Sequence, residues 1–320
     1  MLFAMNPKVY TKILSKGLAI IVWLWLYTAT ERENKRKEAR KMKEQTIGME
    51  LEFTGLTRKT AASIIARHFG KTTRGTSVTD NAEREWKVVS DGSIRVDGGE
   101  ACELVTPILK WDDIETVQEI VRALRGAGAK VNDSCGLHVH IGATGMTATA
   151  IRNLVNNVAS HEEILYKALN VHTGRKRYCR PTDTRFLNAL NARKPATIEE
   201  LGRIWYNQDS DNFPTHHYHE SRYTICNLHA LFTKGTIEFR IFNGTLHAGE
   251  VKTAIQLACA LVAFAKKSTR TLYRPTQTEN EKFAMRTWLI RMGLSGDEFK
   301  TARHHLLKNL DGNAAWRFAS

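Results

Sequence analysis

The chain has 320 residues, of which 42% are hydrophobic and 25% charged, which excludes a largely disordered protein and allows a sizeable core. Its five cysteines are widely spaced and form no CxxC pair, which argues against a disulfide framework and favours a reducing, cytoplasmic setting. The net charge is +14, but setting aside the ten Lys/Arg and four Glu of residues 1–45 leaves +8, and no RNP, KH or zinc-finger pattern is present, so we expect no nucleic-acid partner.

The first 45 residues differ from the rest. Residues 17–30, GLAIIVWLWLYTAT, carry no charge and are followed by the charged run ERENKRKEARKMK. This apolar stretch is shorter than the ~20 residues that span a bilayer comfortably. Three interpretations remain open: a short membrane anchor, an interfacial helix, or sequence upstream of a natural start at Met42. We favour the third, and expect membrane contact only if residues 1–30 are a genuine anchor.

The first predicted strand, residues 47–53, alternates strictly between apolar and other side chains. Its apolar residues share one face, and Glu50 and Glu52 share the other. Two like charges roughly 7 Å apart along a strand repel each other unless water, a basic partner or a cation screens them. Taken alone, this pair is typical of a solvated strand face, so its meaning depends on the rest of the chain.

The remaining elements mix strands and helices, without an internal repeat. Residues 71–85 read as irregular, and residues 207–220 form a loop rich in His and Asp. Alternation predicts strands at 86–94, 100–109, 136–141, 221–230 and 236–242, the first two joined through Gly98 and Gly99. Apolar spacing predicts helices at 57–70, 112–126, 151–170, 197–205 and 248–266, and two more in the tail, the second opened by a capping box from Ser295 to Glu298.

Three of these strands repeat one design. Each has aliphatic or aromatic residues on one face and a pair of functional groups on the other: Glu50 and Glu52, then His138 and His140, then Glu238 and Arg240. In one sheet backed by helices, they would form a concave wall, which Glu103 and Lys87 are expected to join. Carboxylates beside imidazoles suit a hard divalent cation, and Arg and Lys suit phosphate oxygens.

Each motif also has an ordinary interpretation. HVH is found in core and surface strands and in zinc hydrolases, where two imidazoles and a carboxylate leave one coordination position for water. In the EFR motif (238–240), the Glu and Arg most often form a surface ion pair. The segment RKRYCR (175–180) is typical of a solvated loop. Three strands with the same arrangement of an apolar face and a pair of functional groups favour a functional site.

The segment from Met42 to Lys266 resembles the amidoligase family, bacterial and phage relatives of the carboxylate-amine ligases typified by glutamine synthetase and glutamate-cysteine ligase. The resemblance rests on motifs that occur in the family's order: EQTIGMELEFTGLTR, WKVVSDGSI, CELVTPIL, CGLHVHI, RYCRP, RFLNALN and SRYTICNLHALFTKGTIEFRIFNGTLHAG. It implies an α+β fold with a twisted, mainly antiparallel sheet and flanking helices. The expected organisation is an extension at 1–45, a catalytic domain at 46–270 and a helical segment at 271–320.

By this resemblance the reaction is ATP-dependent amide formation by a carboxylate-amine ligase, with Mg²⁺ or Mn²⁺. A substrate carboxylate attacks the γ-phosphate, and an amine then displaces phosphate from the acyl phosphate. The implied metal ligands are Glu50, Glu52, Glu103, His138 and Glu238. The implied nucleotide contacts are Lys87, His140, Arg180 and Arg240. Arg240 would also handle the substrate carboxylate or the phosphoryl group, and Arg240, Glu238 and Lys87 would be catalytic.

Two other functions stay open. A zinc-dependent amidohydrolase would use His138, His140 and a glutamate, and would act without nucleotide. A non-catalytic module driven by the basic N-terminus would bind a membrane or nucleic acid, but the number of carboxylates argues against it. The sequence does not specify the carboxylate and amine substrates or the oligomeric state. It also leaves open the role of the loop at 206–220, which includes His216, His217 and His219. The residues that follow the SRY motif (221–223) depart from the family pattern. In this region only Tyr223 and Asn227 are candidates for a contact.

Overall fold

The strand that carries Glu50 and Glu52 lies at the centre of a seven-stranded sheet in which every neighbouring pair is antiparallel. The computed structural model describes residues 40–216 and 218–316, and the predictions for residues 1–39 lie outside this part. The strand order is β2-β3-β4-β1-β5-β7-β6. The strands are β1 (Ile47–Phe53), β2 (Ser77–Thr79), β3 (Glu85–Val89), β4 (Cys102–Val105), β5 (Gly136–Gly142), β6 (Cys226–Asn227) and β7 (Thr236–Asn243).

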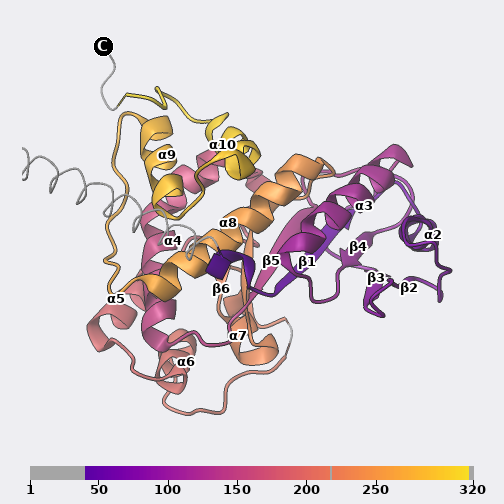
Figure 1. The fold of residues 1–320 in the computed structure, drawn as a ribbon. Helices are drawn as coiled ribbons and strands as arrows, with labels where there is room; N and C mark the ends of the chain where they lie inside the picture. The colour runs from indigo at the N-terminus through magenta and orange to yellow at the C-terminus, as the bar shows by residue number, and fades with distance from the viewer. Residues whose placement is uncertain (1–39, 217, 317–320) are drawn as a thin grey trace, which may run out of the picture. The chain divides into compact units, whose positions relative to one another are not determined.

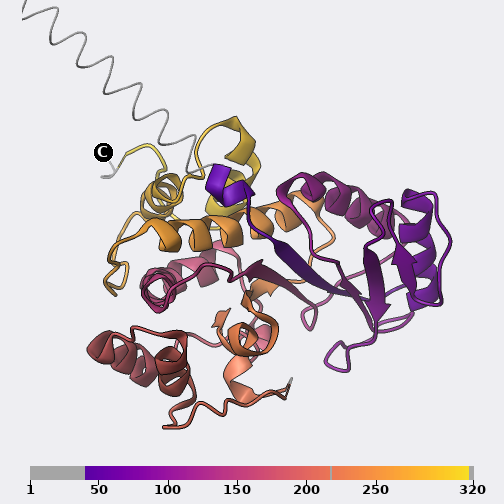
Figure 2. The same cartoon turned by 60° about the horizontal axis from the view of Figure 1, so that its bottom comes forward.

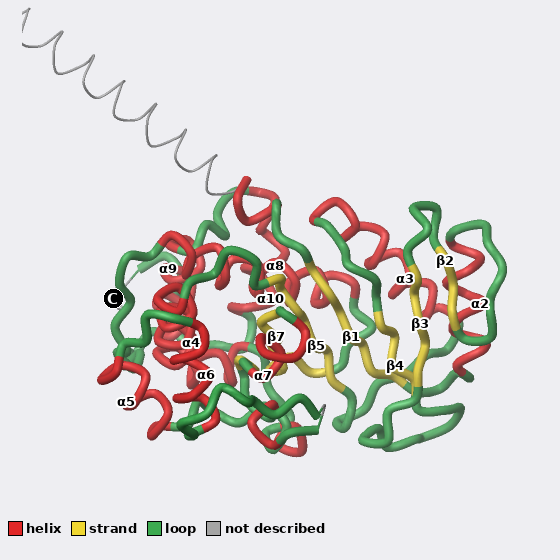
Figure 3. The backbone as a smooth tube through the Cα atoms, turned by 90° about the horizontal axis from the view of Figure 1, so that it is seen from below, coloured by secondary structure: helices red, strands yellow, loops and turns green. Residues whose placement is uncertain are grey.

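Helices pack against one face of this sheet, as Figure 1 shows for α3 and α8. Seen from the other side, β1, β4 and β3 have no helix in front of them (Figure 3). The α-helices that lie wholly within the described residues are α2 (Arg58–His68), α3 (Ile114–Gly126), α4 (Ala148–Ala168), α5 (Thr184–Arg193), α6 (Ile198–Tyr206), α7 (His229–Lys234), α8 (Ala248–Lys267), α9 (Glu281–Arg291) and α10 (Lys300–Leu307). The predicted α+β class, an antiparallel sheet with flanking helices, is confirmed at this level.

The core lies between the sheet and these helices. Met49, Leu51 and Phe53 of β1 are fully buried there, as the alternation of the strand predicts. Helix α8 runs through the core and packs against β5, α3, α4 and α10. It is the one helix among the described residues that is long and apolar enough to cross a membrane, and most of it is buried inside the protein. All five cysteines are buried and free.

Side-chain caps fix where several helices begin. Thr57, Thr147 and Thr197 each accept a hydrogen bond from the backbone three residues later, and Asp183 caps α5 in the same way. The C-terminal helices α9 and α10 pack on the helical layer, with α10 against α8 (Figure 2). The described residues from Met42 onwards form one compact unit.

Two predictions of local structure are wrong, and two elements were not predicted. Residues 221–230 are not one strand, because Asn227 Oδ1 accepts a hydrogen bond from the backbone of His229 and turns the chain from the two-residue β6 into α7. The capping box at Ser295 does not form, since Glu298 instead pairs with Lys43 at 2.7 Å and accepts from Trp111. The short edge strand β2 and the helix α5 were not predicted.

Candidate functional site

The strand register brings the predicted acidic and imidazole residues onto one face of the sheet. Directly opposed pairs across neighbouring strands are Glu50 and His138, Glu52 and Glu103, and His140 and Glu238. Cross-strand partners in an antiparallel pair point to the same side, so β1, β4, β5 and β7 present these six side chains together. The face opposite them carries the core.

Part of this face, without His140 and Glu238, lines a cavity of about 600 Å³. Five predicted site residues line it: Glu50, Glu52, Glu103, His138 and Arg240. The rest of the wall comes from loops and from the short helices at 173–175 and 220–222, and includes Asp91, Ser134, Arg175, Tyr178, Tyr218, Arg222 and Tyr223. The open sheet face is therefore the floor of a pocket that is large enough for a small-molecule ligand.

The imidazoles lie between the carboxylates. His138 Nδ1 is 3.4 Å from Glu50 Oε2, and its Nε2 is 3.8 Å from Glu52 Oε1. His140 Nε2 is 3.3 Å from Glu50 Oε1 and 4.0 Å from Glu238 Oε1. The Nε2 atoms of both histidines are buried and have no hydrogen-bond partner among the described residues. Such atoms normally have a partner, so their position among carboxylates fits a bound cation.

The electrostatics of this cluster divide its carboxylates into two kinds. Burial raises the pKa of Glu103 to about 8, and the neighbouring charges of Glu50 and Glu52 act in the same direction. Burial also acts to raise the pKa of Glu238, but the Arg240 guanidinium outweighs it and lowers that pKa to about 2. In the same way, the neighbouring imidazoles of His138 and His140 outweigh burial and hold the pKa of Glu50 well below its usual value. Burial lowers the pKa of His138, which keeps it neutral near pH 7.

Three groups of side chains have ligand atoms close enough together to share a metal ion. They are Glu50 with Glu103 and His138, Glu50 with His140 and Glu238, and Glu52 with Asp91 and Glu103. Glu50 belongs to two groups and Glu103 to two, so neighbouring ions would share ligands. Oxygen-rich sets of this kind suit Mg²⁺ or Mn²⁺, while the histidines also suit softer metals. The residues present therefore fit divalent cations.

Arg240 and Glu238 form a buried ion pair on β7. Asn227 of β6 donates to the second carboxylate oxygen of Glu238 at 2.6 Å, which fixes that side chain. Arg240 also donates to the backbone oxygen of Tyr178 and lies over the ring of Tyr223. Of the two candidates in the unusual stretch after SRY, Tyr223 thus lines the cavity and Asn227 supports Glu238.

Among the cavity residues that were not predicted from the sequence are Asp91 and Arg175. Asp91 follows β3 in the motif WKVVSDGSI, and its position after a predicted strand was an available signal. Arg175 lies in RKRYCR, where the expectation of a solvated loop holds for the exposed Lys176, Arg177 and Arg180 but not for Arg175, which is 1% exposed. It donates to the backbone oxygen of Arg240 and lies 3.9 Å from Glu52 Oε2. No local pattern distinguishes it from the other basic residues of that loop.

The place of Arg175 depends on Gly136. A Cβ atom at Gly136 would lie 2.0 Å from Arg175 Nη1, and the buried guanidinium has no room to move without losing its contacts. We expect Gly136→Ala to destabilise the protein by about 1–3 kcal/mol in urea unfolding, the usual effect of overpacking. Gly126→Ala at the end of α3, where no atom lies within 4 Å, is the control. Equal stability of the two variants would show that the packing around Arg175 is not tight.

Two predicted nucleotide contacts lie away from this cavity. Lys87 points to the same sheet face, but it is about half exposed, pairs with Glu85 at 2.9 Å and does not line the cavity. Arg180 donates to the backbone oxygens of Tyr223 and Glu220 and lines a different cavity. Their roles stay predictions.

The His-rich loop reaches the cavity through one residue, Tyr218, which lies in its wall. His216 and His219 of this loop form a cluster of rings with His229, and Tyr206 bonds to His229 Nδ1 at 2.6 Å. His217 lies outside the described residues.

Comparison with known proteins gives one family match. A family model described as "Putative amidoligase enzyme" matches residues 43–262. No curated protein matches the chain. Among solved structures, the chain is similar to a bifunctional glutathione synthetase from Pasteurella multocida, with 12% sequence identity and a TM-score of 0.40 over 85% of this chain and 48% of that one. The chain thus spans about half the length of that structure.

Proposed function

Because the chain belongs to the amidoligase family, with the model matching more than half of its length, we propose that it is an ATP- and Mg²⁺-dependent carboxylate-amine ligase. In this reaction a substrate carboxylate attacks the γ-phosphorus of ATP, ADP leaves, and an amine displaces phosphate from the resulting acyl phosphate. The products are an amide, ADP and phosphate. The family membership supports a ligase, and the cavity supports this particular chemistry.

The observation that carries the proposal is that carboxylates and arginines line the same cavity. Carboxylates from β1, β4 and the loop after β3 line it together with Arg175, Arg222 and Arg240, and Tyr223 lies beside two of these arginines. A ligase of this type brings a carboxylate against a triphosphate, so cations must neutralise both anions. The carboxylates would hold metal ions with the triphosphate, and the arginines would hold the substrate carboxylate.

The chain's own groups have definite tasks in this proposal. Glu50, Glu52, Glu103, His138 and Glu238 would hold Mg²⁺, with Asp91 added to the predicted set, and bound Mg²⁺ would neutralise the phosphates and polarise the transferring phosphoryl group. Arg240, whose guanidinium stays charged in its pair with Glu238, would orient the carboxylate or the phosphoryl group. Burial of these groups strengthens each of these interactions.

The finer predictions are part of the same proposal. We propose a catalytic domain of the glutamine synthetase and glutamate-cysteine ligase class, supported by the antiparallel sheet with its acidic face. Small-molecule or peptide carboxylates and amines, including cell-wall fragments, are the proposed partners. The buried free thiols support a cytoplasmic setting, with membrane association through residues 17–30 as the alternative.

The test is ADP release from ATP by the full chain with pooled carboxylates and amines. We expect release only when Mg²⁺ or Mn²⁺, a carboxylate and an amine are all present, with hydroxylamine able to replace the amine as a trap for the acyl phosphate. Amide hydrolysis by zinc-loaded protein without nucleotide would instead establish the amidohydrolase that HVH also allows.

A further inference from the structure

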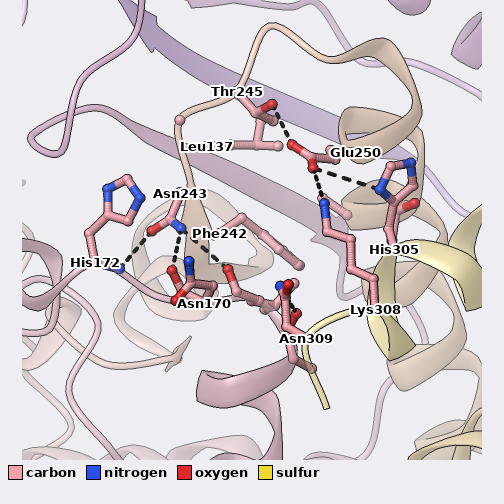
Figure 4. A pocket seen from close by; sticks show the side chains of 15 residues that line it. Leu137, Asn170, His172, Phe242, Asn243, Thr245, Glu250, His305, Lys308 and Asn309 are labelled. Atoms are coloured by element: carbon pink, nitrogen blue, oxygen red, sulfur yellow. Dashed lines mark hydrogen bonds and ion pairs between the residues drawn. The ribbon is translucent and has the colours of Figure 1, made fainter. Parts of the chain in front are cut away.

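A second group of metal-ligating side chains lies behind the sheet, away from the proposed catalytic cavity. A cavity of about 270 Å³ there is lined by the ends of α4 and β7, the start of α8, and α10 (Figure 4). Leu137 and Phe242 in its wall are cross-strand partners, and Leu137 sits between His138 and Gly136, facing the core. The cavity is thus on the face opposite His138.

Three side chains converge beside this cavity: His247, Glu250 and His305. One ligand atom of each lies within 4.8 Å of the others. His305 Nδ1 is 3.6 Å from Glu250 Oε1, which is close to the spacing of two ligands on one metal ion. His305 Nδ1 is also buried and has no hydrogen-bond partner among the described residues.

The backbone allows the two rings to converge. Gly249 lies between them, and a Cβ atom there would meet the rings of both His247 and His305 at 3.0 Å. A larger residue would therefore push the imidazoles apart. Thr245 donates to Glu250 Oε2 at 2.7 Å, which holds that carboxylate and turns its other oxygen towards His305 (Figure 4). A fixed carboxylate of this kind is typical of metal sites.

The ammonium group of Lys308 already lies beside Glu250 in this group of residues. Lys308 Nζ is 2.7 Å from Glu250 Oε1, the same oxygen that faces His305 (Figure 4). The lysine side chain is 38% exposed, so its ammonium group is able to move into water on its flexible stem. The group of residues is therefore built around a positive charge.

We propose that His247, Glu250 and His305 bind one Zn²⁺ ion that fastens α10 to the start of α8, with water as the fourth ligand. Two imidazoles and one carboxylate form a donor set that suits zinc rather than Mg²⁺. Binding displaces Lys308. His247 and Glu250 at the start of α8 and His305 on α10 join the family domain to the C-terminal segment, so the ion is structural and independent of the ligase activity.

The cap of α8 is compatible with this site. His247 Nδ1 accepts a long bond of 3.3 Å from the backbone N–H of Glu250. That N–H also donates to the backbone oxygen of His247 at 2.9 Å, so it keeps a partner when the imidazole binds metal. Loss of the weaker bond is a small cost.

The test measures zinc binding by the full chain after a chelator has removed its bound metal and zinc has been added back. The zinc content is measured by mass spectrometry of the metal, and the zinc affinity by competition with a chromophoric chelator. We expect His305→Ala to lose one equivalent of zinc relative to wild type. His304→Ala, its exposed neighbour on α10, is the matched control and keeps that equivalent. Because zinc also has donors in the catalytic cavity, only the difference between variants counts.

A second variant tests the proposal by gain of affinity. Lys308→Met removes the competing ammonium, so we expect zinc to bind this site about tenfold more tightly, with a larger rise in the unfolding temperature on zinc addition than in wild type. Tetrahedral Co²⁺ absorption lost in His305→Ala and kept in His304→Ala would support the same site. Unchanged zinc content in His305→Ala, or unchanged affinity in Lys308→Met, would overturn the proposal.

Discussion

Glu238→Gln is expected to lower the rate of amide formation at least about 10³-fold, because Glu238 is both a proposed metal ligand and the partner of Arg240. Its two oxygens accept hydrogen bonds from Arg240 and Asn227, and glutamine supplies only one acceptor. Turning the Asn227 amide to compensate would break its bond from the backbone of His229. The measurement is kcat for ADP release with the substrates found by screening.

Glu119→Gln is the matched control, since Glu119 lies on α3, away from the cavity, and is half exposed in a pair with His68. We expect its rate to stay within about twofold of wild type, as surface ion pairs contribute little. Circular dichroism and urea unfolding of both variants would separate loss of chemistry from loss of fold. A fully active Glu238→Gln variant would remove Glu238 from the site.

The second large effect concerns the stability of the metal-free protein at alkaline pH. The pKa of Glu103 is about 8 in the folded protein, because of burial and then the charges of Glu50 and Glu52, against an ordinary value of 4.5. Between these two values the unfolded chain loses the proton and the folded chain keeps it. The free energy of unfolding therefore falls as pH rises through this window, and the loss is complete above about pH 8.

Glu103→Gln removes this titration. With chelator present, we expect the variant to exceed wild type by about 2–4 kcal/mol in free energy of unfolding at pH 8.5, and by little at pH 4.5. With Mg²⁺ present the order should reverse, because the ion stabilises only the protein that retains the carboxylate. Glu163→Gln, at an exposed position on α4, is the control. Equal pH dependence of Glu103→Gln and wild type would show that Glu103 ionises normally.

The sequence was sufficient to predict the central strands and the residues they present. Alternation with a period of two identifies the faces of β1, β5 and β7 without knowledge of their neighbours. What alternation leaves open is the pairing, and the register that sets Glu50 against His138 and Glu52 against Glu103 depends on contacts between distant segments. The resemblance to a family supplied the expectation that these strands are neighbours.

Other parts of the site have no local signal. Arg175 looks like any basic loop residue, and its burial depends on Glu52, on the backbone of Arg240 and on the absence of a side chain at Gly136. Lys87 is the opposite case, because alternation places it on the predicted face but does not give its distance from the cavity. The helix α5 carried a readable signal, since Asp183 precedes apolar residues at helical spacing.

The most direct measurement is calorimetric titration of ATP into the full chain, with and without Mg²⁺, beside Glu50→Gln. The proposed function predicts binding that requires Mg²⁺ and is lost in Glu50→Gln, because Glu50 contributes to two of the candidate cation groups. Absence of ATP binding by the folded wild-type protein in the presence of Mg²⁺ would contradict the proposal that this cavity is a ligase active site.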